Sequence, residues 1–361
     1  MSDFKRYLKT RHAWLFRPAA ALYGTWLSCK YLIQRRRGSL NYLKCLFSAI
    51  FKTEKSLGHP VLLTVEPTNV CDQRCLICET GQGQLGRASR MMTFDEFRNI
   101  LDQFDDDLRI LYFYFMGESF LNRDAYRMIR YAADRGLFVS ACTNGNCVDP
   151  EQLVRSGIAD IQFQIAGTTQ ETHATYRVGG DLNAAISNLR ETIRLRNELG
   201  DAVARPYPMR VGFGLILMKH NEHQIDDFER LAVTCGVDGY QAIDPCVRTV
   251  EQGRVMLPTD KRHWIYDPAA FESGKLVPRV RPRNYCEWIY STMTVQANGD
   301  VVPCCRDPKG CWPLGNVFKD NAYSIWNGEK YRQMRRQVAT AQRGLWLCSL
   351  CEGYSLPRLQ S

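Results

Sequence analysis

The sequence predicts an α/β fold built on a parallel β-sheet, either open or curled into a barrel. Short runs of β-branched and apolar residues alternate with stretches of helical periodicity between residues 58 and 245. This alternation is typical of repeated strand–helix–strand units with right-handed crossovers. The composition, 45% hydrophobic and 24% charged over 361 residues, suits a packed core and excludes disorder for most of the chain.

Local signals predict the individual elements in order. Thr93, with Glu96 three residues later, forms a capping box that starts a helix, and Asn298-Gly299 predicts a hairpin turn. The expected strands are 61–66, 109–115, 137–142, 160–165, 209–217, 239–243, 292–296 and 301–302, and the expected helices are 93–103, 124–135, 150–156, 182–199, 221–235 and 323–338. Ligands of such folds bind at the C-terminal ends of the strands.

The positive charge of the chain is concentrated near its N-terminus. Residues 1–57 hold twelve Lys and Arg against two acids, whereas the remaining 304 residues hold 35 bases and 36 acids. Two apolar stretches, 18–29 and 40–51, lie among the basic residues of this extension. They suit helices in a membrane interface or on an anionic partner; the alternative is two amphipathic helices packed against the body. Nucleic acid is excluded as a partner, because the body has no basic surface or recognition motif.

The chain is expected in the cytoplasm, at the periphery of a membrane if the extension binds lipid. No stretch reaches the roughly 18 apolar residues of a spanning helix. The first dozen residues are charged and lack the pattern of a secretory signal.

Fifteen cysteines in a reducing compartment indicate metal ligands or catalytic thiols rather than disulfides. Cys71, Cys75 and Cys78 form C-x3-C-x2-C directly after the first expected strand. Three thiolates on one short loop can hold three irons of a cubane cluster and leave the fourth iron open. Structural zinc needs four ligands, and His59 is the one histidine nearby. A cluster is therefore favoured over zinc and over unliganded buried cysteines.

This cysteine loop, placed after the first strand of a βα barrel, resembles that of the radical S-adenosylmethionine (SAM) enzymes. The C-terminal cysteines resemble those of their SPASM or shorter Twitch auxiliary domains, so the resemblance covers about residues 58–361. It implies a partial (β/α)6 barrel at 58–245, a linker at 246–285 and an auxiliary cluster domain at 286–361, after the helical extension at 1–57. It also implies SAM and two [4Fe–4S] clusters, one that binds SAM and one auxiliary. The reduced cluster would cleave SAM to a 5′-deoxyadenosyl radical that abstracts a C–H hydrogen.

The resemblance assigns roles to individual residues. Cys71, Cys75 and Cys78 match the cluster ligands. Gly117 and Glu118 match the motif that holds the SAM amino group, Gln164 a ribose contact, Arg177 a partner of the SAM carboxylate, and Met218 an adenine contact. The auxiliary ligands would be Cys286, Cys304, Cys348 and Cys351, with Cys305 or Cys311 as substitutes for Cys304 and a zinc site as the alternative.

Two positions depart from the family pattern. Ile77 precedes the third cysteine, where the family usually has an aromatic residue, so the adenine must pack differently. Ala166-Gly167 replaces a frequent Asp-Gly, so any role of that aspartate is absent.

The fate of the substrate radical stays open between several outcomes. Epimerisation of a carbohydrate-like or lipid-linked metabolite is slightly favoured, with Cys305, Cys311 or Cys142 as the hydrogen donor. The ligand spacing also resembles that of aminocyclitol dehydrogenases, which oxidise an alcohol through the auxiliary cluster. Peptide modification is a third outcome, although residues 1–57 do not resemble a winged-helix peptide-binding module. A non-catalytic iron–sulfur or zinc protein is the remaining alternative. The expected electron donor is of the flavodoxin or ferredoxin type.

Overall fold

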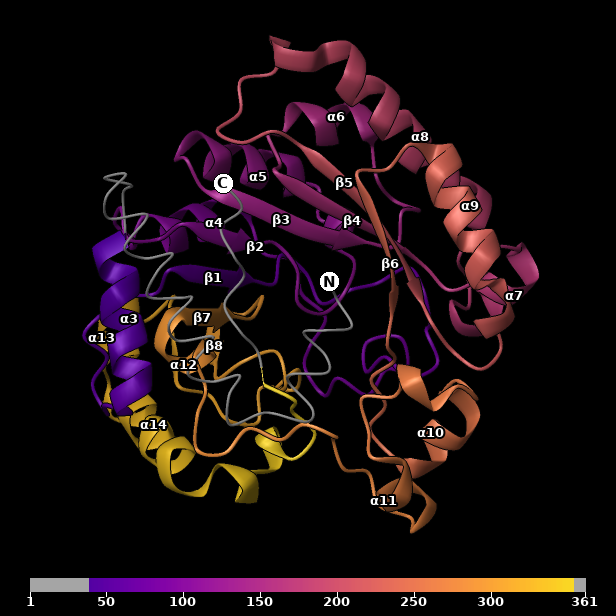
Figure 1. Cartoon of the computed structure of the whole chain (residues 1–361). Coiled ribbons are helices and arrows are strands. Elements are labelled where there is room, and N and C mark those ends of the chain that lie inside the picture. The colour runs from indigo at the N-terminus through magenta and orange to yellow at the C-terminus, as the bar shows by residue number, and fades with distance from the viewer. Residues whose placement is uncertain (1–38, 354–361) are drawn as a thin grey trace.

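The computed structural model describes residues 39–353 of the chain (Figure 1). Its strands are β1 (Leu62–Val65), β2 (Ile110–Tyr112), β3 (Phe138–Thr143), β4 (Asp160–Ile165), β5 (Arg210–Ile216), β6 (Gly239–Ile243), β7 (Thr292–Val295), β8 (Asp300–Val302) and β9 (Gly315–Asn316). Its α-helices are α3 (Ser39–Phe51), α4 (Phe94–Leu101), α5 (Ala125–Asp134), α6 (Pro150–Arg155), α7 (Gln170–Tyr176), α8 (Leu182–Leu199), α9 (Ile225–Cys235), α10 (Val250–Met256), α11 (Pro268–Glu272), α12 (Trp288–Ser291), α13 (Ala322–Trp326) and α14 (Glu329–Ala341).

All nine strands belong to one sheet in the order β6-β5-β4-β3-β2-β1-β7-β8-β9. Strands β1 to β6 pair in parallel in their sequence order, and α4, α5, α6, α8 and α9 cover the outer side of this part of the sheet (Figure 1). Because β1 pairs with β2 and β7 rather than with β6, the six parallel strands form an open barrel. The predicted partial (β/α)6 fold is confirmed.

The C-terminal strands extend the same sheet. Strand β7 pairs in parallel with β1, with Leu62 opposite Thr292 and Val65 opposite Val295, and β8 then returns antiparallel to β7. The turn between them has Gly299 at φ +83°, a backbone conformation that glycine adopts without the cost of a side chain. The predicted hairpin is confirmed, and it is attached edge to edge to the barrel.

One expectation about local structure was wrong. The single helix expected at 323–338 is two helices, α13 and α14. The chain breaks at Asn327, whose side-chain oxygen accepts hydrogen bonds from the Ser56 backbone at 2.9 Å and from Arg335 at 3.1 Å. The segment predicted as a linker, 246–285, contains α10 and α11, and its Trp264 and Tyr266 belong to an apolar cluster shared with Cys75 and Met218.

Helix α3 accounts for the second apolar stretch of the basic extension; the first, 18–29, lies outside the described residues. Cys45 and Ala49 are buried against the body, and Asn41 donates a hydrogen bond to the His59 carbonyl at 3.0 Å. This helix therefore packs on the body, although Phe47 and Phe51 remain exposed on its other side. Within residues 39–353, no helix combines the length and the apolar character needed to cross a membrane.

A buried ion pair fixes the end of β1 to the C-terminal hairpin. The Glu66 carboxylate accepts two hydrogen bonds from Arg87, each 2.7 Å long, and a third from the Ala297 backbone at 2.9 Å. Arg87 also donates to the Pro308 carbonyl at 2.8 Å. The Glu66 side chain has no exposed surface, so this bidentate pair replaces all its contacts with water.

Replacing Arg87 with Met is expected to lower the free energy of unfolding by about 3–5 kcal/mol, because it leaves the Glu66 carboxylate buried without a counter-ion. Urea unfolding followed by circular dichroism measures the loss. Arg98→Met is the control: its pair with Asp95 is exposed and should contribute less than about 1 kcal/mol. Equal, small losses in both variants would contradict this role of the pair.

Candidate functional site

The interior of the open barrel is polar. Thr294, Thr64, Tyr112, Ser140, Asp160 and Arg210 lie opposite one another across six neighbouring strands. Their chain neighbours Leu63, Leu111 and Val139 belong to the apolar core, so alternation along the strands directs this polar layer to the inner face. A closed barrel of this type is filled by branched apolar side chains instead. The polar interior therefore has the chemistry of a binding chamber.

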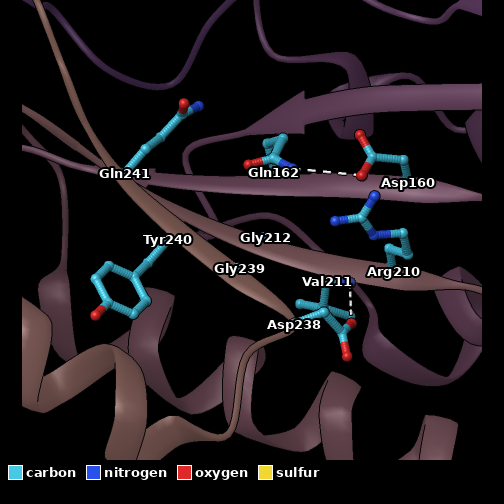
Figure 2. A pocket seen from close by; sticks show the side chains of 9 residues that line it. All are labelled: Asp160, Gln162, Arg210, Val211, Gly212, Asp238, Gly239, Tyr240 and Gln241. Atoms are coloured by element: carbon cyan, nitrogen blue, oxygen red, sulfur yellow. Dashed lines mark hydrogen bonds between the residues drawn. The ribbon is translucent and has the colours of Figure 1, made fainter. Parts of the chain in front are cut away.

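The pocket in Figure 2 lies at the amino ends of β4, β5 and β6. It has a volume of about 180 Å³, and its lining includes Asp160, Gln162, Arg210 and Gln241. Since the cysteine loop follows the carboxyl end of β1, this pocket is at the opposite end of the strands. None of the residues that line it belongs to the cysteine loop.

Cys71, Cys75 and Cys78 lie together on the loop after β1. Backbone N–H groups of the loop donate to the carbonyls of Val178 at 2.9 Å and Tyr176 at 3.3 Å, which fixes the loop against the end of α7. Burial raises the pKa of Cys71 to about 12 and also raises the pKa of Cys75. Cys71 and Cys75 are therefore protonated as free thiols and would have to lose these protons to bind iron.

Glu118 lies beside this loop in a fully buried position. Its carboxylate accepts hydrogen bonds from the Thr143 hydroxyl at 3.0 Å and from the backbones of Asn144 at 2.9 Å and Phe120 at 3.3 Å. Burial raises the pKa of Glu118 to about 7, against the opposing effect of these hydrogen bonds. The preceding Gly117 has φ +78°, and a Cβ there would lie 2.6 Å from the Thr68 carbonyl oxygen. Only glycine lets the backbone approach the cysteine loop so closely.

Arg177 approaches the loop from the end of α7. It is buried and donates to the Gln73 side chain at 3.2 Å. Among the described residues, the Arg177 Nε and the Nε2 of the neighbouring His173 have no hydrogen-bond partner. Burial, with the Arg177 charge, lowers the pKa of His173 to about 4, so the imidazole is neutral. An unsatisfied guanidinium N–H beside the cysteine loop suits an incoming carboxylate.

The other two predicted SAM contacts differ in accessibility. Gln164 lies on β4 in a half-buried position, on the same inner face as Gln162. Met218 has no exposed surface and packs in the apolar cluster that also contains Cys75 and Ala166. Its backbone N–H is already bonded to the Asn221 side chain at 2.7 Å. The adenine contact at Met218 stays a prediction.

The three candidate hydrogen donors differ in their surroundings. Cys142, on β3, and Cys305 both contribute to raising the pKa of Tyr114, after its burial, so both lie near this tyrosine. Cys311 is exposed. Burial, reinforced by Asp160 and Glu118, raises the pKa of Cys142 to about 12, which keeps it as a neutral thiol.

Cys286, Cys304, Cys348 and Cys351 are gathered from distant parts of the sequence. Burial raises the pKa of Cys304 and Cys286, and the other members of the set raise it further. Among the described residues, the one group of three or more ligand atoms within 4.8 Å of one another is His59, Asp105 and Asp107. The four thiols stay the predicted auxiliary ligands, with a zinc site as the alternative.

Sequence reasoning missed the residues that hold these groups in place. Gln73 links Arg177 to Asn146, and Asp72 accepts a hydrogen bond from the Asn144 side chain at 2.7 Å. The polar Thr143-Asn144 pair directly after a strand was the available signal. Its contact with Glu118 joins two strand ends, which no local pattern specifies.

Residues 65–231 match the radical SAM superfamily, and residues 286–352 match SPASM, an iron–sulfur cluster-binding domain. The mycofactocin maturase MftC of Mycobacterium ulcerans is 27% identical over 315 residues, 81% of each chain. The PqqA peptide cyclase of Bradyrhizobium diazoefficiens is 23% identical over 231 residues, 57% of each chain. The fold is also that of Streptococcus suis SuiB, solved with its precursor peptide SuiA: the TM-score is 0.57 at 13% identity, over 87% of this chain and 75% of SuiB. The two matched domains carry SAM and [4Fe–4S] clusters as cofactors.

If Glu118 holds the SAM amino group, the affinity for SAM is expected to rise about tenfold between pH 6 and pH 8, because Glu118, with its pKa of about 7, ionises over this range. Equilibrium dialysis of SAM against anaerobically reconstituted protein measures this affinity at each pH. Glu118→Gln should bind SAM weakly and lose this pH dependence. An unchanged pH profile in the variant would contradict the role of Glu118.

Proposed function

We propose that this chain, a radical SAM enzyme with a C-terminal SPASM domain, modifies a peptide. The main support is the similarity to MftC over 81% of both chains, together with the similarity to a PqqA peptide cyclase. The carbohydrate-like or lipid-linked substrate favoured by the sequence finds no support among these relatives. The peptide alternative therefore becomes the main proposal.

An exposed strand edge offers a way to bind a peptide. Strand β6 ends the sheet order of the described residues, and Gly239, Tyr240, Gln241 and Ala242 are all exposed. Unprotected edge strands present unpaired backbone N–H and C=O groups, and an extended peptide can add to such an edge as a further strand. A peptide paired with β6 would run beside the polar chamber.

The residues at the reactive end have complementary tasks in this proposal. When bound, the cluster and SAM supply the 5′-deoxyadenosyl radical that abstracts hydrogen from carbon. Cys71, Cys75 and Cys78 would hold the cluster. Glu118 would accept the SAM amino N–H groups, and Arg177 would pair with the SAM carboxylate. Gln164, facing the chamber, would contact the ribose.

The proposed outcome after abstraction depends on the thiols near Tyr114. Cys142 is held as a neutral thiol by burial and by Asp160, the form that can return a hydrogen atom to a carbon radical. This observation keeps epimerisation as the outcome to examine first. Oxidation through the auxiliary set of Cys286, Cys304, Cys348 and Cys351, with a flavodoxin- or ferredoxin-type donor for the SAM cluster, is the second candidate.

Random synthetic octapeptides are expected to raise 5′-deoxyadenosine formation several-fold above the substrate-free rate, because a bound substrate traps the radical. The reconstituted full-length enzyme is incubated anaerobically with SAM and dithionite, and modified peptides are identified by mass spectrometry. The parallel incubation contains monosaccharides and aminocyclitols.

The variant with Ala at positions 71, 75 and 78 is the control and should form no 5′-deoxyadenosine. Product formed from the sugar panel, with the peptides inert, would overturn the peptide proposal and restore the metabolite substrate.

A further inference from the structure

Two guanidinium groups donate hydrogen bonds to the sulfur of Cys246, and the Tyr266 hydroxyl lies further from it. This residue follows β6 on the loop that leads to α10. Arg306 Nη1 lies 3.0 Å from the sulfur, Arg248 Nη1 lies 3.1 Å from it, and the Tyr266 hydroxyl lies 3.7 Å from it. Two guanidinium groups directed at one atom are the surroundings of an anion rather than of a neutral thiol.

The Cys246 sulfur connects three segments that are distant in sequence. Arg248 also donates to the Glu79 carboxylate at 2.9 Å, and Glu79 directly follows Cys78 on the loop after β1. Arg306 follows Cys304 by two residues in the auxiliary domain. The sulfur therefore lies where the loop after β6 meets the loops of both cysteine sets.

The charges around Cys246 distinguish it from other thiols of the chain. Burial raises its pKa, but the neighbouring charges of Arg306 and Arg248, with the Tyr266 hydrogen bond, outweigh burial and lower it. Cys147 has the opposite surroundings. Burial and the Asp72 carboxylate, which lies 3.4 Å from its sulfur, raise the pKa of Cys147 to about 12. Both cysteines are partly accessible to solvent, so their difference in reactivity should follow from charge.

We propose that Cys246 is a modification site, a resident thiolate that undergoes exchange with low-molecular-weight disulfides such as glutathione disulfide. The thiolate attacks one sulfur of the disulfide and forms a mixed disulfide, and the other half leaves as a thiolate. Cys246 is oxidised, and the attacked disulfide accepts the two electrons. A second thiol reverses the step: its thiolate attacks the mixed disulfide, and Cys246 leaves as a thiolate.

Modification would change the contact between the loops. It removes the negative charge that Arg248 and Arg306 share and adds a bulky group between the two cysteine sets. The site would thus make the enzyme sensitive to the ratio of disulfide to thiol. This inference does not depend on the nature of the substrate.

The rate of modification tests the proposal. Full-length protein, anaerobically reconstituted, is treated with glutathione disulfide between pH 6 and pH 9, and each cysteine is followed by peptide mass spectrometry. At pH 7, Cys246 should react at least tenfold faster than Cys147. Its rate should rise less steeply with pH than the rate at Cys147, which should rise about tenfold per pH unit, because only the thiolate reacts.

Substitution of the guanidinium groups tests the cause. Arg248→Gln should shift the rate profile of Cys246 to higher pH and slow its reaction at pH 7. Arg155→Gln, which removes an exposed arginine paired with Glu151, should leave the profile unchanged. A Cys246 rate that rises with pH as steeply as that of Cys147, or a profile unaffected by Arg248→Gln, would overturn the proposal. Arg306→Gln, a substitution in the auxiliary domain, should likewise shift the rate profile of Cys246 to higher pH.

Discussion

The buried pair of Glu66 and Arg87 is the interaction on which the arrangement of the two cysteine sets depends. Glu66 directly follows β1, the strand that pairs with the barrel on one side and with the C-terminal hairpin on the other. Its carboxylate also accepts the Ala297 N–H, while Arg87 reaches the Pro308 carbonyl. Barrel and auxiliary region thus share one sheet and one buried charge pair. Glu66 and Arg87 thus connect the chain just before the cysteine loop to the segment after Cys304.

The reactive end combines groups held in opposite protonation states. Burial keeps Cys142 a neutral thiol, raises the pKa of Glu118 to about 7, and keeps His173 uncharged. At Cys246, by contrast, two guanidinium groups outweigh burial. Desolvation thus acts on every group here, and nearby charges add to its effect on the pKa of Cys142 and His173 but oppose it at Cys246.

Patterns within one segment of the sequence predicted most of the fold. The alternation of strands and helices, the capping box at Thr93 and the Asn298-Gly299 hairpin were all found near their expected positions. Features made by distant residues were missed. The break at Asn327 depends on its contacts with Ser56 and Arg335, and the short helix α7 has little local signal beyond its Thr169 cap. Similarly, the spacing of the cysteines predicted both ligand sets. The surroundings of Cys246, by contrast, depend on Arg306, which lies sixty residues away in the sequence.

Iron content distinguishes a sheet that carries two cluster sites from a sheet that carries only one. After anaerobic reconstitution, the wild-type chain should hold about eight irons, since each [4Fe–4S] cluster contains four. Replacing Cys71, Cys75 and Cys78 with Ala should leave about four, and so should replacing Cys286, Cys348 and Cys351. About four irons in the wild type, all lost in the first variant and all kept in the second, would contradict the auxiliary cluster site.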